Sequence, residues 1–409
     1  MLKPIMWPVL VPSLLFAVGL GSILPILVLG ALNLGSSTSF AAAIVGIMGA
    51  VSLAATVPAG ILIDRLGDFR AMLAATIVAV IVLGTVVAAF LWDSPASLLV
   101  YTVALMLFAP VSDVWSLARQ AVVAEVMPPA HLAKAMTALG GTQRVGNLVG
   151  PMVGAGLMLV FPLWSVFVFS GLSAVAAIVV MALPVARVPD LGGPGVRRDS
   201  ATHGPSDRAH GRHREPLDVR WRAVILVGVS IIALAAARAA QPVVIQLWGV
   251  EIGLHKSSIS LIIALGAALE LIVMFVGAYI KDRLGRVATL AACLTIFGAG
   301  FVIMVALPDL RGMVIAAVVM ACGNGLGAGV NMTIGADLSP AVGRPRFLGI
   351  WAIFNNGGKL GGPTLLSLII TLSTLRFGVL FPGLFAIAGA AWVLVWARRI
   401  GLPGRRGRA

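Results

Sequence analysis

Five charged side chains stand inside long apolar stretches of the sequence, where charge is unusual. They are two acids and three bases: Asp113, Arg144, Arg238, Glu270 and Lys359. A charged group at mid-depth in a bilayer costs at least about 2.5–3.5 kcal/mol, so each of these residues suggests a function. A carboxyl group in such a setting can take up and release a proton. Asp113 and Glu270 are therefore predicted proton sites, with a permanent structural ion pair as the alternative for each.

Helix geometry predicts the depth of these charges. With a rise of about 1.5 Å per residue, Asp113 and Arg144 both fall near mid-membrane on consecutive antiparallel helices, where a carboxylate and a guanidinium can pair. Glu270 lies roughly 15 Å and Arg238 roughly 24 Å from one membrane surface, so a second acid–base pair is less well matched. Lys359 has no obvious acidic partner in the sequence.

Neutral amides in the same stretches add hydrogen-bonding capacity, and they either line a cavity or bond across helices. These amides are Gln143, Asn147, Gln241, Gln246, Asn324, Asn331, Asn355 and Asn356. The predicted substrate cavity takes six of them together with the three bases. Its candidate residues are Arg144, Arg238, Lys359, Gln143, Asn147, Gln241, Asn324, Asn355 and Asn356.

The composition indicates which elements must position these residues. The chain of 409 residues is 60% hydrophobic and 11% charged, whereas a soluble domain is about 45–50% apolar and about 25% charged. Only helices and closed barrels span a bilayer. The apolar residues form continuous runs, such as 223–237 and 287–307, and do not alternate as barrel strands do. The sequence therefore predicts an all-α integral membrane protein.

Breaking the apolar runs at charges, prolines and glycines gives twelve predicted spans. They cover residues 8–32, 40–63, 71–92, 97–123, 132–160, 163–186, 222–249, 257–280, 288–307, 311–336, 345–372 and 376–397. This predicts an N-terminal six-helix bundle (1–186), a linker (187–221) and a C-terminal six-helix bundle with a basic tail (222–409). The linker is rich in arginine and poor in large apolar residues, which is typical of a flexible segment. Its histidines lack a fixed scaffold, so no metal site is predicted.

The basic residues predict the orientation. If both termini and the linker share one side, that side carries 22 of the 29 Lys and Arg residues, and the opposite side carries three. Cytoplasmic loops hold the excess of Lys and Arg in membrane proteins, so both termini and the linker are expected in the cytoplasm. The basic face is expected to contact anionic lipid headgroups, and no nucleic-acid partner is predicted.

Three short motifs recur in the same order in the two halves. With an offset of 218 or 212 residues, the pairs are Asp64-Arg65-Leu66-Gly67 with Asp282-Arg283-Leu284-Gly285, Ala124-Glu125 with Ala336-Asp337, and Gly150-Pro151 with Gly362-Pro363. Such repetition indicates duplicated halves, which are common among transporters.

The segment from Gly60 through Asp64, Arg65 and Gly67 to Arg70 resembles the signature loop of the major facilitator superfamily, although Asp68 stands where that pattern prefers a cation. The second copy contains Asp282, Arg283 and Gly285. This resemblance covers essentially the whole chain and implies two pseudo-symmetric six-helix bundles that carry a solute. It also implies that the loop latches the halves in the outward-facing state, with Arg119 as a partner of Asp64 or Glu125. The alternative is that the loop charges only anchor the topology. The implied latch residues are Gly60, Asp64, Arg65, Gly67, Arg70, Arg119, Asp282, Arg283 and Gly285.

The fifth predicted helix carries a finer resemblance. The spacing of Gly146, Gly150, Pro151 and Gly154 is similar to the antiporter motif of bacterial multidrug and siderophore exporters, although Ala155 replaces the second glycine of the closing pair. Glycines every four residues form a smooth face that lets another backbone approach closely. Pro151 is expected to bend the helix. The bend is implied to favour antiport, and simple helix packing is the alternative.

The resemblance implies a secondary active, proton-coupled exporter of small amphipathic organic compounds that works by alternating access in the cell inner membrane. Its expected partners are a small-molecule substrate, protons and the lipid bilayer; a monomer without cofactor or metal is expected. A uniporter or importer of a small organic anion or other solute is the alternative. A membrane enzyme is disfavoured, because the sequence lacks H-E-x-x-H, G-x-S-x-G and phosphate-loop motifs. A non-transporting sensor is disfavoured, because twelve spans in 409 residues leave no room for a signalling domain.

Overall fold

The computed structural model describes residues 3–92, 94–127, 129–186, 219–340 and 344–401, apart from some side chains within them. All regular structure in these ranges is helical. The helices of the first half are α1 (Lys3–Ile5), η1 (Met6–Leu10), α2 (Val11–Ile23), η2 (Leu24–Ile26), α3 (Leu27–Asn33), α4 (Thr38–Leu66), α5 (Asp68–Leu91), α6 (Ser97–Val126), α7 (Pro129–Val160), α8 (Ser165–Ala182) and η3 (Pro184–Ala186). Those of the second half are α9 (Trp221–Glu251), α10 (Lys256–Leu284), α11 (Arg286–Ala306), α12 (Leu310–Leu326), α13 (Val330–Leu338), α14 (Arg344–Leu372), α15 (Leu375–Val395) and α16 (Ala397–Ile400).

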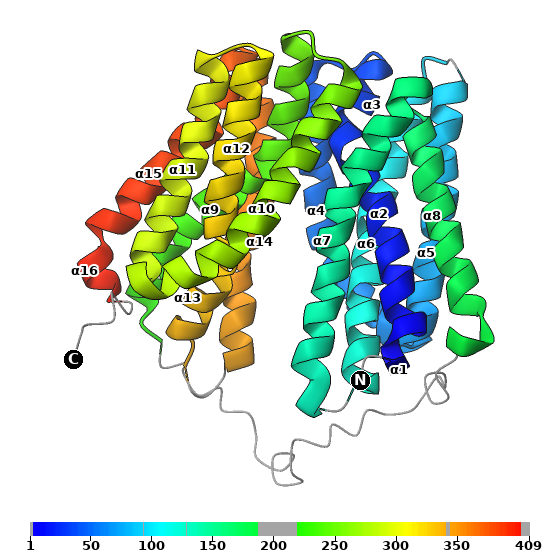
Figure 1. The fold of residues 1–409 in the computed structure, drawn as a ribbon, viewed down its shortest axis with the longest axis horizontal. Coiled ribbons are helices and arrows are strands. Elements are labelled where there is room, and N and C mark those ends of the chain that lie inside the picture. The colour runs from blue at the N-terminus through cyan, green and yellow to red at the C-terminus, as the bar shows by residue number, and fades with distance from the viewer. Residues whose placement is uncertain (1–2, 93, 128, 187–218, 341–343, 402–409) are drawn as a thin grey trace.

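Ten helical segments of the described chain are long and apolar enough to cross a membrane. α7 and α14 are two further helices of membrane length, with 32 and 29 residues. The prediction of an all-α membrane fold with twelve spans is therefore confirmed, and the protein is a multi-pass membrane protein. In Figure 1 the long helices run side by side, and α1 and α16 lie at the same end of the bundle.

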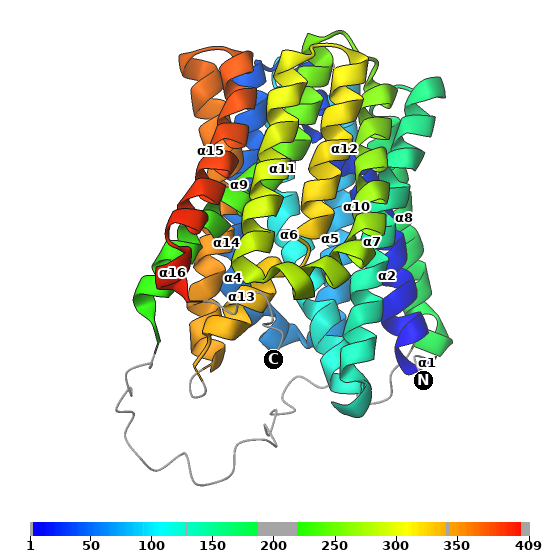
Figure 2. The same ribbon diagram turned by 60° about the vertical axis from the view of Figure 1, so that its left-hand side comes forward.

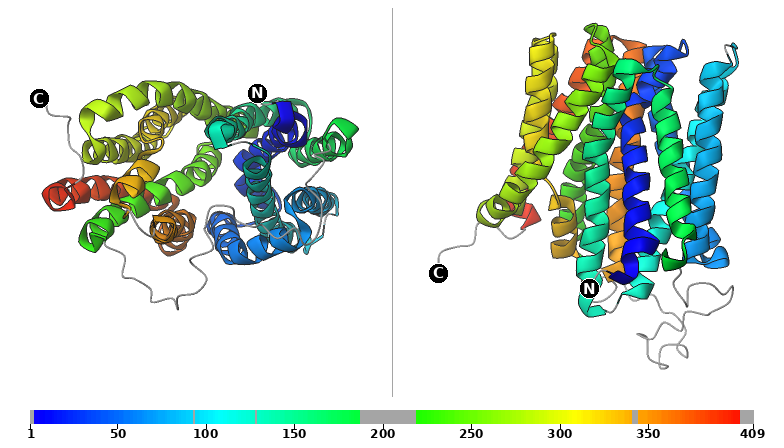
Figure 3. Two further views of the ribbon diagram at one scale, coloured as in Figure 1. Left: turned by 90° about the horizontal axis from the view of Figure 1, so that it is seen from below. Right: turned by 45° about the vertical axis from the view of Figure 1, so that its right-hand side comes forward.

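The two halves stand beside each other, as the view from below shows (Figure 3). They meet through two pairs of helices, α4 with α14 and α7 with α10; Figure 2 shows the second pair side by side. We call the end where η3 finishes and α9 begins the linker-side end. The opposite end, which holds the turns before α4 and α10, is the far end.

The repeated motif was expected to form a loop, but in each half a single glycine makes the turn between two helices. α4 continues to Leu66 and α5 begins at Asp68, so only Gly67, with φ 81°, separates them. Gly285, 218 residues later, makes the same turn with φ 83°. The predicted loop around Asp64 and Arg65 is wrong, because both residues belong to the last turn of α4. A turn of one residue in this conformation requires glycine, which has no Cβ to clash.

The repeat also extends to features that the sequence motifs did not reveal. Gly35 and Gly253, again 218 residues apart, have φ 85° and 76° at the far end. Two predicted spans are broken: the first by η2 at Leu24–Ile26, which contains Pro25, and the tenth between α12 and α13, where Gly329 has φ 79°. Breaks of this kind free backbone groups that must then find other partners.

Small residues bring equivalent helices into close contact in both halves. A Cβ on Gly150 of α7 would lie 2.4 Å from the carbonyl carbon of Gly21 on α2. A Cβ on Gly362 of α14 would lie 2.3 Å from the carbonyl oxygen of Ala236 on α9. Gly146 and Gly358, one turn earlier in each helix, are equally crowded. The smooth face predicted for the fifth span thus packs on the first span, and its counterpart in the second half packs in the same way.

Candidate functional site

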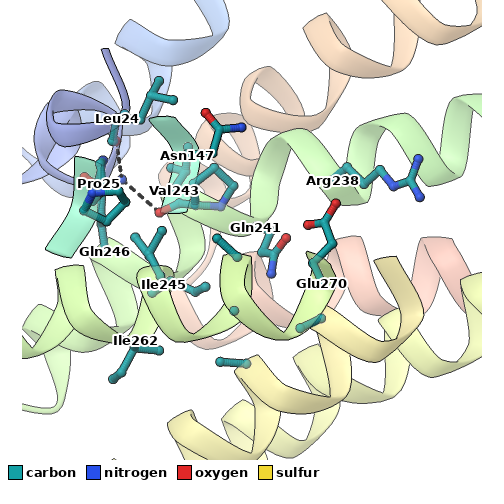
Figure 4. A pocket seen from close by; sticks show the side chains of 18 of the residues that line it. Leu24, Pro25, Asn147, Arg238, Gln241, Val243, Ile245, Gln246, Ile262 and Glu270 are labelled. Carbon is teal, nitrogen blue, oxygen red and sulfur yellow. Dashed lines mark hydrogen bonds between the residues drawn. The ribbon is translucent and has the colours of Figure 1, made fainter. Parts of the chain in front are cut away.

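A cavity of about 260 Å³ lies between the two halves. The first half contributes residues of α2, η2, α3, α4 and α7, and the second half contributes residues of α9, α10 and α12. Most of its wall is apolar. Its polar side chains are Asn147, Arg238, Gln241, Gln246 and Glu270, and Figure 4 shows these five around the cavity.

The acid and the base of this cavity are linked through one asparagine. Asn324 Nδ2 donates a hydrogen bond of 2.7 Å to Glu270 Oε2, and Arg238 Nη2 donates one of 3.3 Å to the backbone oxygen of Asn324. Asn324 belongs to the last turn of α12, where carbonyl groups lack helical partners and a cation is favoured. Gly327 makes room for the guanidinium, because a Cβ there would lie 2.7 Å from Arg238 Nη2.

Glu270 and Arg238 each keep hydrogen-bonding capacity that the described residues do not use. Glu270 makes no ion pair with any other residue that the structure describes. Arg238 Nε is buried and has no hydrogen-bond partner. The less well matched pair of the sequence prediction is therefore an indirect one, and both ions keep capacity for a ligand.

Asp113 lies in a second polar cluster, formed by α4, α6 and α14. The Ser52 hydroxyl donates a hydrogen bond to Asp113 Oδ2, and the Lys359 ammonium lies within electrostatic range of the same carboxylate. Lys359, for which the sequence suggested no acid, thus faces an acid of the other half. Ser52 and Asp113 are part-buried, and Lys359 is exposed. Because Lys359 belongs to α14, the cluster spans the boundary between the halves.

Asp113 and Arg144 do not pair, contrary to the depth argument. Arg144 is exposed, and no ion pair between the two occurs in the described part of the chain. The reason is that α6 and α7, although consecutive in the sequence, pack mainly on other helices: α6 packs on α4 and α5, whereas α7 packs on α2 and α10. Equal depth therefore did not mean contact.

Arg119 is 6% exposed and lies deep in the first half. Its guanidinium stacks 4.7 Å from the ring centroid of Trp115 and donates from Nη2 to Gln143 Oε1 at 3.1 Å. Gln143 in turn donates to Asn147 Oδ1 at 3.3 Å, so a polar chain connects Arg119 to the cavity. Nε and Nη1 of Arg119 have no hydrogen-bond partner. Among the described side chains Arg119 makes no ion pair, and its implied pairing with Asp64 or Glu125 stays a prediction.

The remaining latch candidates lie at the linker-side end. Arg65 and Arg70 are exposed and Gly60 is part-buried. The side chains of Asp64, Asp282 and Arg283 fall outside the described ones. Next to the second motif, Arg286 Nε pairs with Asp337 Oδ2 at 3.1 Å and joins α11 to α13. The latch stays a prediction, as does the effect of Pro151 on α7.

Several predicted cavity residues lie elsewhere. Of the nine, Asn147, Gln241 and Arg238 line the cavity, and Asn324 and Gln143 touch its lining residues. Arg144, Lys359, Asn355 and Asn356 are not among the lining residues. Asn355 and Asn356 are part-buried on α14.

Gln246, which the sequence offered only as one amide among eight, joins the two halves above the cavity. It is 1% exposed, and its Oε1 accepts from the backbone amides of Val28 at 3.0 Å and Leu29 at 3.4 Å. Its Nε2 donates to the carbonyls of Leu24 at 3.3 Å and Pro242 at 2.9 Å; Figure 4 shows it beside Leu24 and Pro25. The break at η2 leaves these backbone groups without helical hydrogen-bond partners. A side-chain amide can bond to both the N–H donors and the carbonyl acceptors. Pro25 was the signal in the sequence, since a proline interrupts the ladder of the helix that contains it.

Two further hydrogen bonds cross between the halves, both at the far end. Lys256 Nζ donates to Asn33 Oδ1 at 2.5 Å, and Ser367 Oγ donates to the carbonyl of Ser39 at 2.8 Å. Within the described residues, every hydrogen bond between the halves lies at or near this end. The structure is therefore closed at the far end.

The family model of the Major Facilitator Superfamily matches residues 9–237 and 226–408, nearly the whole chain. The chain belongs to the major facilitator superfamily. As a member of this superfamily it is a membrane transporter.

Solved structures show the same fold at low sequence identity. One is a POT family transporter in complex with 5-aminolevulinic acid, with 12% identity, 96% of each chain covered and a TM-score of 0.78. Another is a bacterial homolog to human lysosomal transporter Spinster in an inward-facing and occupied conformation, with 13% identity, 98% of each chain covered and a TM-score of 0.74. No curated protein matches the chain. These likenesses establish the fold, and the substrate must be argued from the site.

Proposed function

We propose that this superfamily member is a proton-coupled exporter of small amphipathic organic compounds. The observation that carries the proposal is the cavity between the halves: its wall is mainly apolar, and it contains one carboxylate, Glu270, held by an amide and not by an ion pair. An apolar wall with a few polar groups suits an amphipathic ligand. A carboxylate without a fixed counter-ion is free to exchange a proton when the cavity opens to either side.

Asp113 is the second proton site of this proposal. It lies across the boundary between the halves from Lys359 and accepts from Ser52. Rocking of residues 1–186 against residues 222–409 changes what faces this carboxylate, and this links its protonation to the state of the carrier. The Gly-Pro motif of α7, through its resemblance to efflux transporters, supports antiport. The proposed setting is the cell inner membrane, with both termini in the cytoplasm and the protein acting as a monomer.

A second candidate function is uniport or import of a small organic anion. The observation that favours it is Arg238, whose buried Nε has no hydrogen-bond partner although the residue lines the cavity. A buried guanidinium donor without a partner is a ready site for a carboxylate or phosphate. In this candidate the two carboxylates are structural.

The test is transport into proteoliposomes with an inside-acidic pH gradient and a panel of fluorescent amphipathic cations. For an antiporter, wild type should accumulate substrate against its concentration gradient. Glu270→Gln and Asp113→Asn should each abolish this accumulation, because neither amide can carry a proton. Glu251→Gln is the matched control, since Glu251 is an exposed acid at the far end of α9.

Thermal unfolding of each variant shows whether the substitution affects folding. A protein-dependent flux that is unchanged by the pH gradient and by both substitutions would contradict proton coupling and support a uniporter. Uptake of organic anions that Arg238→Gln weakens, without any response to the pH gradient, would support the second candidate directly.

A further inference from the structure

A second cavity, of about 390 Å³, opens on the outer surface of the first half between α4 and α5. Its lining is apolar throughout: α4 contributes Ala55, Pro58 and Leu62, α5 contributes Ala74 and Val78, and α6 provides its floor, including Val114. Pro58, Leu62 and Val78 are exposed at its rim, and Val114 is buried at its base. We call this feature the lateral groove.

The lateral groove is separate from the substrate cavity and shares no lining residue with it. α5 packs on α4, α6 and α8, all in the first half, and presents Ile77 and Ile81 outward. The substrate cavity is lined by α2, η2, α3, α7, α9, α10 and α12 together with Val45, near the start of α4. For membrane-spanning helices, an apolar groove on this outer side is accessible to lipid.

Two arginines extend the walls of the lateral groove toward the linker-side end. On α4, Pro58, Leu62 and Arg65 follow one another at spacings of four and three residues. On α5, Arg70, Ala74 and Val78 are each four residues apart. Residues at these spacings share one helix face, so Arg65 and Arg70 lie directly below the apolar walls. Both arginines are exposed, whereas the neighbouring residue Asp68 is buried, with 9% exposure.

The depth of the groove fits one leaflet. Leu62 lies about 6 Å from the end of α4 and Val78 about 15 Å from the start of α5, at about 1.5 Å per residue. A leaflet contributes about 15 Å of the roughly 30 Å hydrocarbon core. The groove thus covers the depth of the acyl chains, and the arginines fall at the level of the phosphates.

We propose that the lateral groove binds an anionic phospholipid of the linker-side leaflet, with one acyl chain between α4 and α5 and the phosphate on Arg65 and Arg70. The guanidinium group is suited to phosphate because it offers several donors in a fixed plane. The turn at Gly67 brings the two helix ends together, so one headgroup can meet both arginines. The proposal does not depend on the substrate of the carrier.

The bound chain lies behind one of the proposed proton sites. Ala55 is one turn from Ser52 on α4, and Val114 follows Asp113 on α6. An acyl chain that holds α4 and α5 apart therefore supports the helices that carry the Ser52–Asp113 hydrogen bond. The lipid would act on the carrier through the placement of these two helices.

The test is lipid retention by the purified, delipidated full-length protein, measured by native mass spectrometry with added phosphatidylglycerol or phosphatidylcholine. Wild type should retain one phosphatidylglycerol and bind phosphatidylcholine more weakly. Arg65→Gln combined with Arg70→Gln should weaken phosphatidylglycerol about 30-fold, the ratio expected for two basic contacts near a membrane surface. Arg398→Gln combined with Arg399→Gln is the matched control, because these exposed arginines lie at the same end on α16.

The groove itself is tested by filling it. Ala74→Phe should remove the bound lipid, whereas Ala88→Phe, at an exposed position of the same helix outside the groove, should leave it unchanged. If Ala74→Phe lowers the unfolding temperature, Val78→Trp fills the groove from its exposed rim. Retention of phosphatidylglycerol by a folded groove-filled variant would overturn the proposal. Equal retention of both lipids by wild type, or equal losses in the two arginine pairs, would overturn it as well.

Discussion

Gln246→Leu should shift the carrier away from the far-end-closed state. Leucine has a similar size but no polar atoms, so the substitution removes the acceptor of the Val28 and Leu29 amides and the donor to Leu24. These backbone groups stay buried as long as the far end is closed. When it opens, water can reach them, so the penalty falls on the closed state alone.

The magnitude follows from the hydrogen bonds that are lost. The Val28 amide, at 3.0 Å, is the better donor, and the Leu29 amide, at 3.4 Å, is marginal. One buried unsatisfied donor costs about 1–3 kcal/mol. This corresponds to a change of about 5- to 150-fold in the ratio of closed to open molecules.

The assay is a pair of spin-label distance measurements in a background without the two native cysteines. Labels at Val160 and Leu372 report the far end, and labels at Val185 and Arg398 report the linker-side end. In Gln246→Leu the far-end distances should lengthen and the linker-side distances should shorten. Gln241→Leu is the control, because Gln241 lies on the same helix and lines the cavity but makes no hydrogen bond between the halves within the described residues. Distances in Gln246→Leu that match both wild type and the control would refute the role assigned to Gln246.

Three further outcomes are expected. Gly150→Ala and Gly362→Ala should each lower the free energy of unfolding by about 1–3 kcal/mol through overpacking. The controls Gly156→Ala and Gly361→Ala should not lower it, because no atom lies within 4 Å of a Cβ added at either position. Thermal unfolding in detergent measures all four variants. Gly67→Ala and Gly285→Ala should each lower the free energy of unfolding by about 1–3 kcal/mol, because φ near 80° strains any residue with a Cβ. Gly84→Ala, inside α5, is the control, and an equal loss of stability in this variant would contradict the prediction. Arg238→Gln should raise KM about 10-fold or more for a substrate that carries an anionic group, because a charge-assisted hydrogen bond is lost. Arg144→Gln, outside the cavity, should leave KM unchanged. KM is obtained from initial transport rates measured against substrate concentration.

The fold could be predicted because its determinants are local. Apolar runs and their interruptions placed the twelve spans, and the repeated glycines and acids placed them in two halves. Contacts between helices could not be predicted in the same way. Residue counting gave Asp113 and Arg144 similar depths, but it carried no information on whether α6 touches α7. Asp113 instead meets Ser52 and faces Lys359, which lies 246 residues away in the sequence.

The candidate site was predicted in part for a related reason. Arg238 and Glu270 stood out because charge is rare in apolar stretches, and both line the cavity. Gln246 did not stand out, because an amide is common and its partners are backbone groups, which every residue carries. These backbone groups lack helical partners only because the helix is broken at Pro25. The side chain that bonds to them, Gln246, lies in the other half of the chain.

The hydrogen bonds of Gln246 also make water a participant in the transport cycle. Opening the far end must hydrate the amides of Val28 and Leu29 and the carbonyl of Leu24, which are dry in the closed state. Hydration of these groups is then part of the equilibrium between the two states, so the activity of water acts on that equilibrium. Solutes that are excluded from protein surfaces, such as sucrose, favour the state with less hydrated surface. Such solutes should therefore oppose the hydration of these three groups, which is one part of the opening step at the far end.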